Sequence, residues 1–522
     1  MSSTGVSDPR HLGTVLKIAL FATGCAGIVA EFVLSTLATY LIGNAIFQWT
    51  MVMSMMLFAM GVGSRISRLF RRHLLETFIL VEFALSTLCA VSAMLAYAAA
   101  GYTDYTDLLI YMLALMIGGL IGLEIPLVTR VNNTYEELRI NISGVMEKDY
   151  YGALLGGIIF AFFALPYLGL TYTPIILGSV NFLVAGLVLW RFFFLLERRR
   201  MLVSIGGVTL AGLVAIGILA QPVIIHGEQK KYVDKVIYSA QTPYQKIVMT
   251  QWRQHHWLYI NGQQQFSTYD EERYHEPLVH PAMVLAPDAR RVLILGGGDG
   301  LAVREVLKHG SVESVTLVDL DPAMTDLARS HPVLVTINDG SLNHPAVTVI
   351  NTDAGRFLET DDALYDVVIV DLPDPDTVDL MHLYDLDFYT MVGRHLVRGG
   401  VFVTQATSPF FSRRAFQCIL RTVREAGFTA LPYHNPIPTM GEWGWVLGVR
   451  SADMDEKTLK ERVIAGDYEA LATRFLNGDA VISMVHFGRG VIDPSVVAEV
   501  AVNRRSRPVL HRYYADGSWG IY

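Results

Sequence analysis

A long stretch without charged side chains limits the fold of this chain more than any other feature. Residues 150–190 contain no Asp, Glu, Lys or Arg, and Pro166 and Pro174 interrupt them. Because about 20 apolar residues cross a lipid bilayer, this stretch is long enough for two spanning helices. The same criterion predicts a membrane domain over residues 1–225 with seven helices, at 13–41, 45–64, 74–100, 106–129, 150–167, 173–191 and 201–222.

The distribution of charge divides the chain into two parts. Residues 1–220 hold 13 of the 41 Lys and Arg and 12 of the 49 Asp and Glu, which leaves 28 basic and 37 acidic residues for 221–522. The second part therefore has the composition of a soluble, moderately acidic domain. This balance disfavours a disordered chain and a nucleic-acid-binding protein. Cys25, Cys89 and Cys418 lie too far apart in sequence to indicate a disulfide framework or a thiolate metal site.

Arginine clusters indicate which loops face the cytoplasm. The basic residues gather after the second predicted helix, in the loop 130–149, and after the sixth helix, as Arg65, Arg68, Arg71, Arg72, Arg130, Arg139, Lys148, Arg191, Arg198, Arg199 and Arg200. This pattern predicts a multi-pass protein of the cell membrane with a cytoplasmic N-terminus. Seven spanning helices would deliver the C-terminal domain to the outer face, whereas the failure of one segment to span would leave it inside. The side of that domain therefore stays open.

Three acidic residues fall inside the predicted membrane helices. Glu31, Glu82 and Glu124 are expensive to place in a bilayer, which favours a functional role. Hydrogen bonding between helices, or a position near the end of a helix, is the structural alternative.

The C-terminal part begins with a predicted β-rich cap, residues 226–285, in which Asn261-Gly262 favours a tight hairpin turn. From 286 to 450 strands alternate with helices, and the strands are expected at 291–295, 314–318, 347–350, 367–370 and 401–404. This alternation predicts a parallel, doubly wound, Rossmann-like sheet that binds its ligand at the carboxyl ends of the strands. Residues 451–522 are expected to pack on this domain as an extension that adds little of its own.

A glycine-rich turn and an acidic residue follow the first two of these strands. Gly296-Gly297-Gly298-Asp299-Gly300 lets backbone approach a ligand, and Asp319, 19 residues after Gly300, suits a ribose diol. The run departs from G-x-G-x-x-G, which disfavours a nicotinamide cofactor. The pattern indicates another nucleoside-containing ligand, with a simple tight turn as the alternative.

A pair of carboxylates follows the predicted buried strand 367–370. Asp371 and Asp374, in the sequence Asp-Leu-Pro-Asp-Pro, can face one small cavity from a loop stiffened by proline. Tyr274-His275-Glu276 lies upstream of the sheet and could cover that cavity. Acidic and aromatic side chains together suit a cationic amine. A solvated loop is the alternative for the acidic pair alone.

Together these segments resemble the spermidine synthases, or polyamine aminopropyltransferases, over about residues 236–450. The resemblance rests on Tyr244-Gln245, Leu258–Gly262, Gln265-Phe266, Asp270-Glu271, Tyr274-His275-Glu276, Leu293–Gly300, Arg304-Glu305 and Asp371–Pro375. The membrane part, with Thr407-Ser408-Pro409 and Gly441–Trp445, is similar to the membrane-fused branch of that family.

The resemblance implies transfer of an aminopropyl group from decarboxylated S-adenosylmethionine to putrescine, giving spermidine and methylthioadenosine. It implies that Asp371 is the general base and that Asp374 binds ammonium groups. The other substrate-binding residues are expected to be Gln245, Asp319, Asp353 and Ala354 around the nucleoside, and Tyr274, His275 and Asp299 around the aminopropyl and amine groups. The resemblance also implies a homodimer, and this chemistry requires neither a metal nor a resident cofactor.

Three positions depart from the family pattern. Asp319 stands where Glu is usual, Met440 where an aromatic residue is common, and Val378 where proline often follows the acidic motif. The change at Met440 leaves the identity of the amine open. Two other functions remain as alternatives: an S-adenosylmethionine-dependent methyltransferase, and a polyamine transporter whose soluble domain senses ligand.

Overall fold

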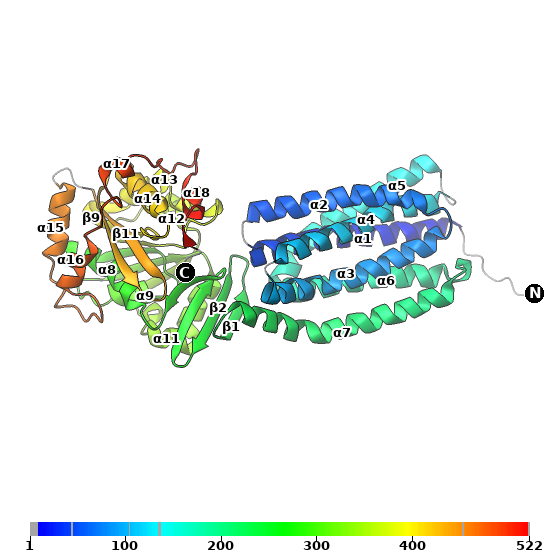
Figure 1. The fold of residues 1–522 in the computed structure, drawn as a ribbon, viewed down its shortest axis with the longest axis horizontal. Coiled ribbons are helices and arrows are strands. Elements are labelled where there is room, and N and C mark those ends of the chain that lie inside the picture. The colour runs from blue at the N-terminus through cyan, green and yellow to red at the C-terminus, as the bar shows by residue number, and fades with distance from the viewer. Residues whose placement is uncertain (1–8, 43–44, 104, 134–136, 451–453, 520–522) are drawn as a thin grey trace, which may run out of the picture. The chain divides into compact units, whose positions relative to one another are not determined.

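The computed structural model describes residues 9–519 except 43–44, 104, 134–136 and 451–453. The chain divides into two compact units, a helical unit (Met1–Lys235) and an α/β unit (Val236–Tyr522) (Figure 1).

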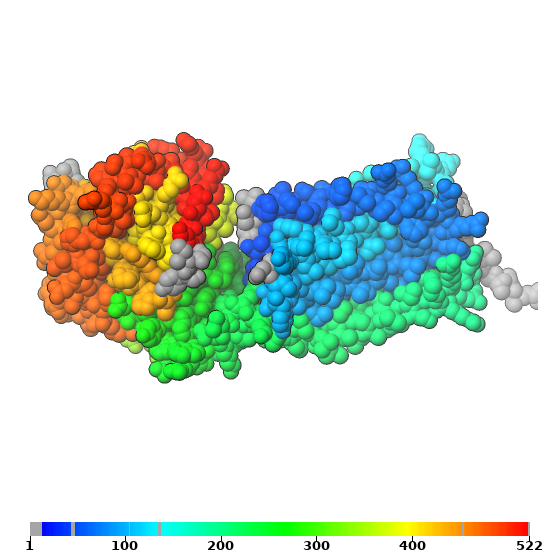
Figure 2. Space-filling model, viewed as in Figure 1, coloured from blue at the N-terminus to red at the C-terminus, as the bar shows by residue number. Residues whose placement is uncertain are grey.

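All seven predicted helices are present in the described part of the helical unit. They are α1 (Pro9–Ile42), α2 (Ala45–Ile66), α3 (Leu74–Tyr102), α4 (Thr106–Asn132), α5 (Leu138–Ile159), α6 (Gly169–Arg191) and α7 (Arg199–Lys231). Short 3₁₀ turns follow α2 and α6, at Ser67–Leu69 and Phe193–Leu195. Figure 2 shows α7, in green, along one edge of this unit.

Two of the predicted helix boundaries are wrong for the same physical reason. Helix α5 begins at Leu138 rather than at 150, and α7 continues to Lys231 rather than ending at 222. Charged residues end an apolar stretch without ending a helix, because Glu, Lys and Gln are good helix formers. The first residues of the predicted β-rich cap therefore belong to α7, and the first strand starts at Lys235.

Helices α5 and α6 are separated by a reversal of the chain. A π-helical turn, Phe160–Leu168, follows α5, and Gly169 then adopts a φ of 62°, which glycine tolerates best. The Thr173 hydroxyl donates a hydrogen bond of 3.2 Å to the carbonyl of Ala164 across this reversal. Six helical segments among the described residues are long and apolar enough to cross a membrane, and one of them, Leu138–Arg191, contains both α5 and α6.

Close contacts between α1 and α5 establish their relative direction. A Cβ added at Gly152 would lie 2.1 Å from the carbonyl oxygen of Phe21, and one at Gly156 would lie 2.5 Å from that of Cys25. Because both positions advance together along the two helices, α5 runs parallel to α1. Backbones that approach this closely require small residues at the contact.

The N-termini of the odd-numbered helices lie together at one end of the helical unit. A single apolar cluster there joins early residues of α1, α3, α5 and α7 with late residues of α4 and α6, namely Leu16, Phe78, Val145, Leu202, Val128 and Val188. Helix α1 therefore begins, and α7 ends, at opposite ends of the bundle. The arginines of 65–72 and 191–200 lie in the connections, or in the adjoining helix ends, at the end where α1 begins. The connecting residues 43–44, 103–105 and 160–168 contain no Lys or Arg in the sequence.

The α/β unit begins with a four-stranded sheet. Its strands, β1 (Lys235–Gln241), β2 (Lys246–Trp252), β3 (His255–Ile260) and β4 (Gln263–Ser267), lie in chain order, and β2, β3 and β4 pair antiparallel. Asn261 and Gly262 both have positive φ, 52° and 84°, as the predicted two-residue hairpin turn requires.

The second sheet has seven strands in the order β10-β11-β9-β8-β5-β6-β7. All five predicted strands are confirmed as β5 (Arg291–Gly296), β6 (Ser314–Asp319), β7 (Val347–Asn351), β8 (Tyr365–Asp371) and β9 (Leu396–Gln405), which run parallel. The sheet is mixed rather than wholly parallel, because β10 (Thr429–Ile437) and β11 (Gly441–Val449) add an antiparallel hairpin at one edge. A hairpin needs no crossover helix, so the βαβ pattern could not reveal these strands.

Helices cover both faces of this sheet, as the doubly wound prediction requires. One face packs against α8 (Glu272–Leu285), α9 (Leu301–Val306), α10 (Pro322–Ser330), α11 (Pro332–Ile337), α15 (Glu456–Ile464) and α16 (Gly478–Met484). The other packs against α12 (Ala354–Thr360), α13 (Leu386–Arg394), α14 (Arg413–Glu425), α17 (Pro494–Val497) and α18 (Leu510–Ala515). Further 3₁₀ turns span Ser341–Asn343 and Asp379–Leu383.

Candidate active site

The residues predicted to form the site line one cavity at the carboxyl edge of the seven-stranded sheet. All nine are present in its lining: Gln245, Tyr274, His275, Asp299, Asp319, Asp353, Ala354, Asp371 and Asp374. The cavity lies where the strand order changes direction, between β5 and β8. Ligands of doubly wound folds bind at this kind of switch point.

The register of β5 and β8 brings the glycine turn and the acidic loop together. Gly296 pairs with Asp371 across the two strands, and the Gly297 N–H donates a 3.0 Å hydrogen bond to the carbonyl of Asp371. A Cβ on Gly297 would lie 3.2 Å from the Asp371 carboxylate, and its φ of 65° also favours glycine. The glycine turn thus leaves space for the carboxylate of Asp371 beside it.

Asp319 occupies the position expected of a ribose-binding acid, at the end of β6. Its Oδ2 accepts a 3.1 Å hydrogen bond from the Gly298 N–H, and its Oδ1 accepts one of 2.9 Å from the Asp321 N–H. Burial, helped by the charge of nearby Asp299, raises the pKa of Asp319 to about 6, although these backbone bonds oppose the shift.

Two more predicted residues lie at the N-terminus of α12. The Asp353 side chain caps this helix by accepting a 2.8 Å hydrogen bond from the Arg356 N–H, and Ala354 follows it. A 3.2 Å contact with His382 lowers the pKa of Asp353. Gln245 reaches the cavity from the turn before β2, where the Thr242 hydroxyl accepts a 2.9 Å hydrogen bond from its N–H.

Asp371 is held by aromatic residues of α8. The Tyr274 hydroxyl donates a 2.7 Å hydrogen bond to Asp371 Oδ1, and the rings of Tyr274 and His275 are 4.9 Å apart. Burial raises the pKa of Asp371 to about 6, although the charge of His275 and the Tyr274 hydrogen bond lower it and Asp299 raises it. The carboxyl is therefore largely ionised at neutral pH.

His275 is kept protonated by an ion network behind the cavity. Burial alone lowers the pKa of His275, but its 3.1 Å contact with Glu271 and the charges of Asp299 and Asp371 raise the pKa to about 9. Burial would raise the pKa of Glu271, but hydrogen bonds from His275 and a two-point contact with Arg304, at 2.9 Å each, hold it well below its usual range.

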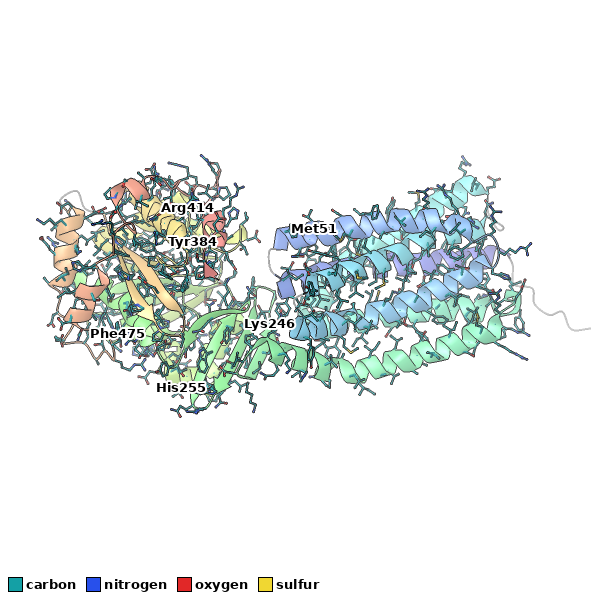
Figure 3. The ribbon with its side chains drawn as sticks, viewed as in Figure 1. Met51, Lys246, His255, Tyr384, Arg414 and Phe475 are labelled. Carbon is teal, nitrogen blue, oxygen red and sulfur yellow. The ribbon has the colours of Figure 1, made fainter. Side chains whose placement is uncertain are left out.

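Asp374 is buried and is fixed by two elements. Gln405, at the end of β9, donates a 3.3 Å hydrogen bond to Oδ1, and the Tyr514 hydroxyl on α18 donates one of 2.8 Å to Oδ2. Burial, helped by the charge of Asp376, raises the pKa of Asp374 to about 7 against the lowering effect of these two bonds. Tyr384, labelled in Figure 3, is also fully buried and donates a 2.8 Å hydrogen bond to the carbonyl of Pro373 in the same loop.

Three residues of this site were missed by the sequence analysis: Gln405, Tyr384 and Tyr514. Gln405 could have been found, because it directly follows the predicted strand 401–404 and so lies at the ligand-binding edge. No sequence signal identified Tyr384 or Tyr514. The expectation that residues 451–522 add little is wrong, since Tyr514 of that extension bonds Asp374. Met440, the noted departure from the family, lines the cavity.

An uncharged residue at position 371 should make the folded protein more stable than the ionised Asp371 does. Because its pKa in the fold is about 6 and an ordinary Asp has 3.8, ionisation destabilises the folded protein as pH rises between these values. We expect Asp371→Asn to raise the free energy of unfolding by about 2–3 kcal/mol at pH 8 and by less than about 1 kcal/mol at pH 4. Thermal unfolding at both pH values measures this. The exposed Asp339→Asn is the matched control, and a variant less stable than wild type at pH 8 would contradict the burial argument.

Comparisons with known proteins identify the family. The spermine/spermidine synthase domain family matches residues 271–462. Polyamine aminopropyltransferase 2 of Aquifex aeolicus (strain VF5) is 41% identical over 505 residues, which cover 96% of this chain and 99% of that protein. A polyamine aminopropyltransferase of Leptospira interrogans is 38% identical over 97% of this chain and 99% of that protein. A solved spermidine synthase from Thermotoga maritima is 26% identical and covers 49% of this chain and 85% of its own, with a TM-score of 0.43.

The two enzymes from Aquifex and Leptospira match nearly the whole chain, so the similarity includes the helical unit as well as the α/β unit. Their identity and coverage establish the family that the motifs indicated. This protein is a transferase that belongs to the polyamine aminopropyltransferase family.

Proposed function

We propose that this enzyme transfers the aminopropyl group of decarboxylated S-adenosylmethionine to putrescine, yielding spermidine and methylthioadenosine. The observation that carries the proposal is the presence of Asp371 and Asp374 in the same cavity as Asp319. A carboxylate such as Asp319 suits ribose hydroxyls, and two carboxyls on a rigid loop suit an amine with two ammonium groups.

The acceptor amine must lose a proton before its nitrogen can attack, because putrescine is an ammonium ion in water. Asp371, ionised at neutral pH, accepts this proton as general base. The hydrogen bond from Tyr274 orients the carboxylate, and Asp374 holds ammonium groups so that the attacking nitrogen is aligned.

The donor requires no acid catalyst. The amine nitrogen forms a bond to the aminopropyl carbon as the bond from that carbon to sulfur breaks, and the electron pair returns to sulfur. The positively charged sulfonium thus leaves as the neutral thioether methylthioadenosine. The proton released by the amine passes to Asp371, and the second product is spermidine.

A product assay on the purified full-length protein in detergent tests this function. Decarboxylated S-adenosylmethionine and a panel of amines should give methylthioadenosine and a new polyamine by mass spectrometry, with putrescine as the best acceptor. We expect Asp371→Asn to lower kcat at least about 100-fold, since a general base contributes about 10²–10⁴. Asp339→Asn is the control. Donor or product binding without aminopropyl transfer to any amine would refute the proposal.

We further propose that the helical unit spans the cell membrane with its arginine-rich end in the cytoplasm. Large apolar side chains point outward from its helices, such as Phe58, Phe162, Leu183, Trp190 and Val208, which are 68–75% exposed. The intramembrane acids Glu31, Glu82 and Glu124 are instead buried between helices. An apolar exterior with buried polar groups is the arrangement that a bilayer requires.

This orientation supports an outward-facing active site. Because α7 ends at the opposite end of the bundle from the arginines, it leaves the membrane on the non-cytoplasmic side. The α/β unit follows within a few residues of Lys231, too few to cross the bilayer again. The nucleoside donor would then have to reach the site from the outer side.

Cysteine labelling on intact cells tests the orientation. In a chain without Cys25, Cys89 and Cys418, a membrane-impermeant maleimide should label Lys457→Cys, whose side chain is 83% exposed in the α/β unit. Glu197→Cys, at the arginine-rich end and 78% exposed, should react only after permeabilisation. The reverse pattern would refute the orientation, and release of the protein by alkaline carbonate would refute the membrane span itself.

A further inference from the structure

The C-terminal segment of the chain reaches the acidic loop of the active site. Tyr514, in α18, donates its 2.8 Å hydrogen bond to Oδ2 of Asp374 from a part of the sequence without a recognised motif. Tyr514 is absent from the lining of the cavity, and Asp374 is part of it. The tyrosine is therefore linked to the cavity by its hydrogen bond to the Asp374 carboxylate.

Several contacts fix the position of this tyrosine. The Trp519 indole N–H donates a 3.0 Å hydrogen bond to the carbonyl of Tyr514, and the Trp519 ring stacks on Phe411 with centroids 5.7 Å apart. The Ser518 N–H donates a 2.8 Å hydrogen bond to the carbonyl of Phe411. The Ser412 hydroxyl donates one of 3.1 Å to the carbonyl of Tyr513. Residues 513–519 are thus anchored to the 411–412 turn on both sides of Tyr514.

The two hydrogen bonds to Asp374 leave its carboxylate oxygens able to accept further hydrogen bonds from a cation. Gln405 bonds one oxygen and Tyr514 the other, and each carboxylate oxygen keeps a further lone pair. Removing the tyrosine hydroxyl would free one oxygen of a buried carboxylate, which disfavours its charged form.

We propose that Tyr514 is a positioning residue of the amine site, which orients the Asp374 carboxylate to bind an ammonium group. The proposal rests on the aminopropyl transfer proposed above. It assigns the C-terminal extension a part in amine binding.

The pH dependence of amine binding should report this role. The groups that face Asp374 are Asp376 in its own loop, Tyr274 of α8, Tyr384, and Tyr514 of α18. Burial and Asp376 raise the pKa of Asp374, and the Tyr514 hydrogen bond lowers it. Without that bond the pKa of Asp374 must rise. The acid limb of the pH profile, which is the fall of kcat/KM for the amine toward low pH, therefore moves to higher pH.

The test compares Tyr514→Phe with Tyr513→Phe. Both changes remove one hydroxyl from the same helix, but the Tyr513 hydroxyl accepts a hydrogen bond from the Ala501 N–H and has no contact with Asp374 among the described residues. We expect Tyr514→Phe to raise KM for putrescine about tenfold at pH 7, with kcat within about threefold, and to move the acid limb to higher pH. Tyr513→Phe should behave as wild type.

A Tyr514→Phe enzyme with wild-type KM and an unchanged acid limb would overturn the proposal. If the wild-type protein forms no aminopropyl product, the proposed function fails, and calorimetric titration with putrescine then decides the role of Tyr514. About tenfold weaker binding to Tyr514→Phe supports the positioning role, whereas equal binding, or no binding to wild type, overturns it. Unfolding temperatures of the three proteins show whether the substitutions have altered the fold.

Discussion

The pairing of two parallel strands, β5 and β8, determines how this active site is assembled. Their register sets Gly296 opposite Asp371, and the hydrogen bond from the Gly297 N–H to the Asp371 carbonyl holds the two loops together. Since parallel strands end at one edge of a sheet, every motif that follows a strand is brought to the same cavity. A shift of this register by one residue would turn the Asp371 side chain toward the opposite face of the sheet.

The proposed chemistry also requires that Asp371 and Asp374 can be ionised in a cavity whose burial disfavours their charged forms. Burial raises the pKa of Asp371 to about 6 and that of Asp374 to about 7. The Tyr274 and Tyr514 hydroxyls and the charge of His275 oppose this effect, and Glu271 keeps His275 protonated. An acidic cavity of this kind attracts ammonium groups and can still accept a proton near neutral pH.

Much of the fold and the site could be predicted because the signals are local. An uninterrupted apolar sequence is enough to locate the membrane-like helices of 150–190 and the strands that end near Gly296, Asp319 and Asp371. Because parallel strands end at one edge of a sheet, the acids that follow them could be predicted to lie together. Contacts made by distant segments left no such signal: Tyr514 lies 140 residues from Asp374 in sequence. The antiparallel hairpin β10–β11 was missed because a hairpin lacks the alternation of strand and helix.

The donor provides the most direct test of the account, because ordinary S-adenosylmethionine differs from the decarboxylated form by one carboxylate. That carboxylate would meet the negative charges of Asp371 and Asp374. Calorimetric titration of the full-length protein at pH 8, where both acids are ionised, should give a Kd at least about tenfold lower for the decarboxylated donor. Equal or tighter binding of ordinary S-adenosylmethionine would contradict an acidic site built for aminopropyl transfer and would favour methyl transfer.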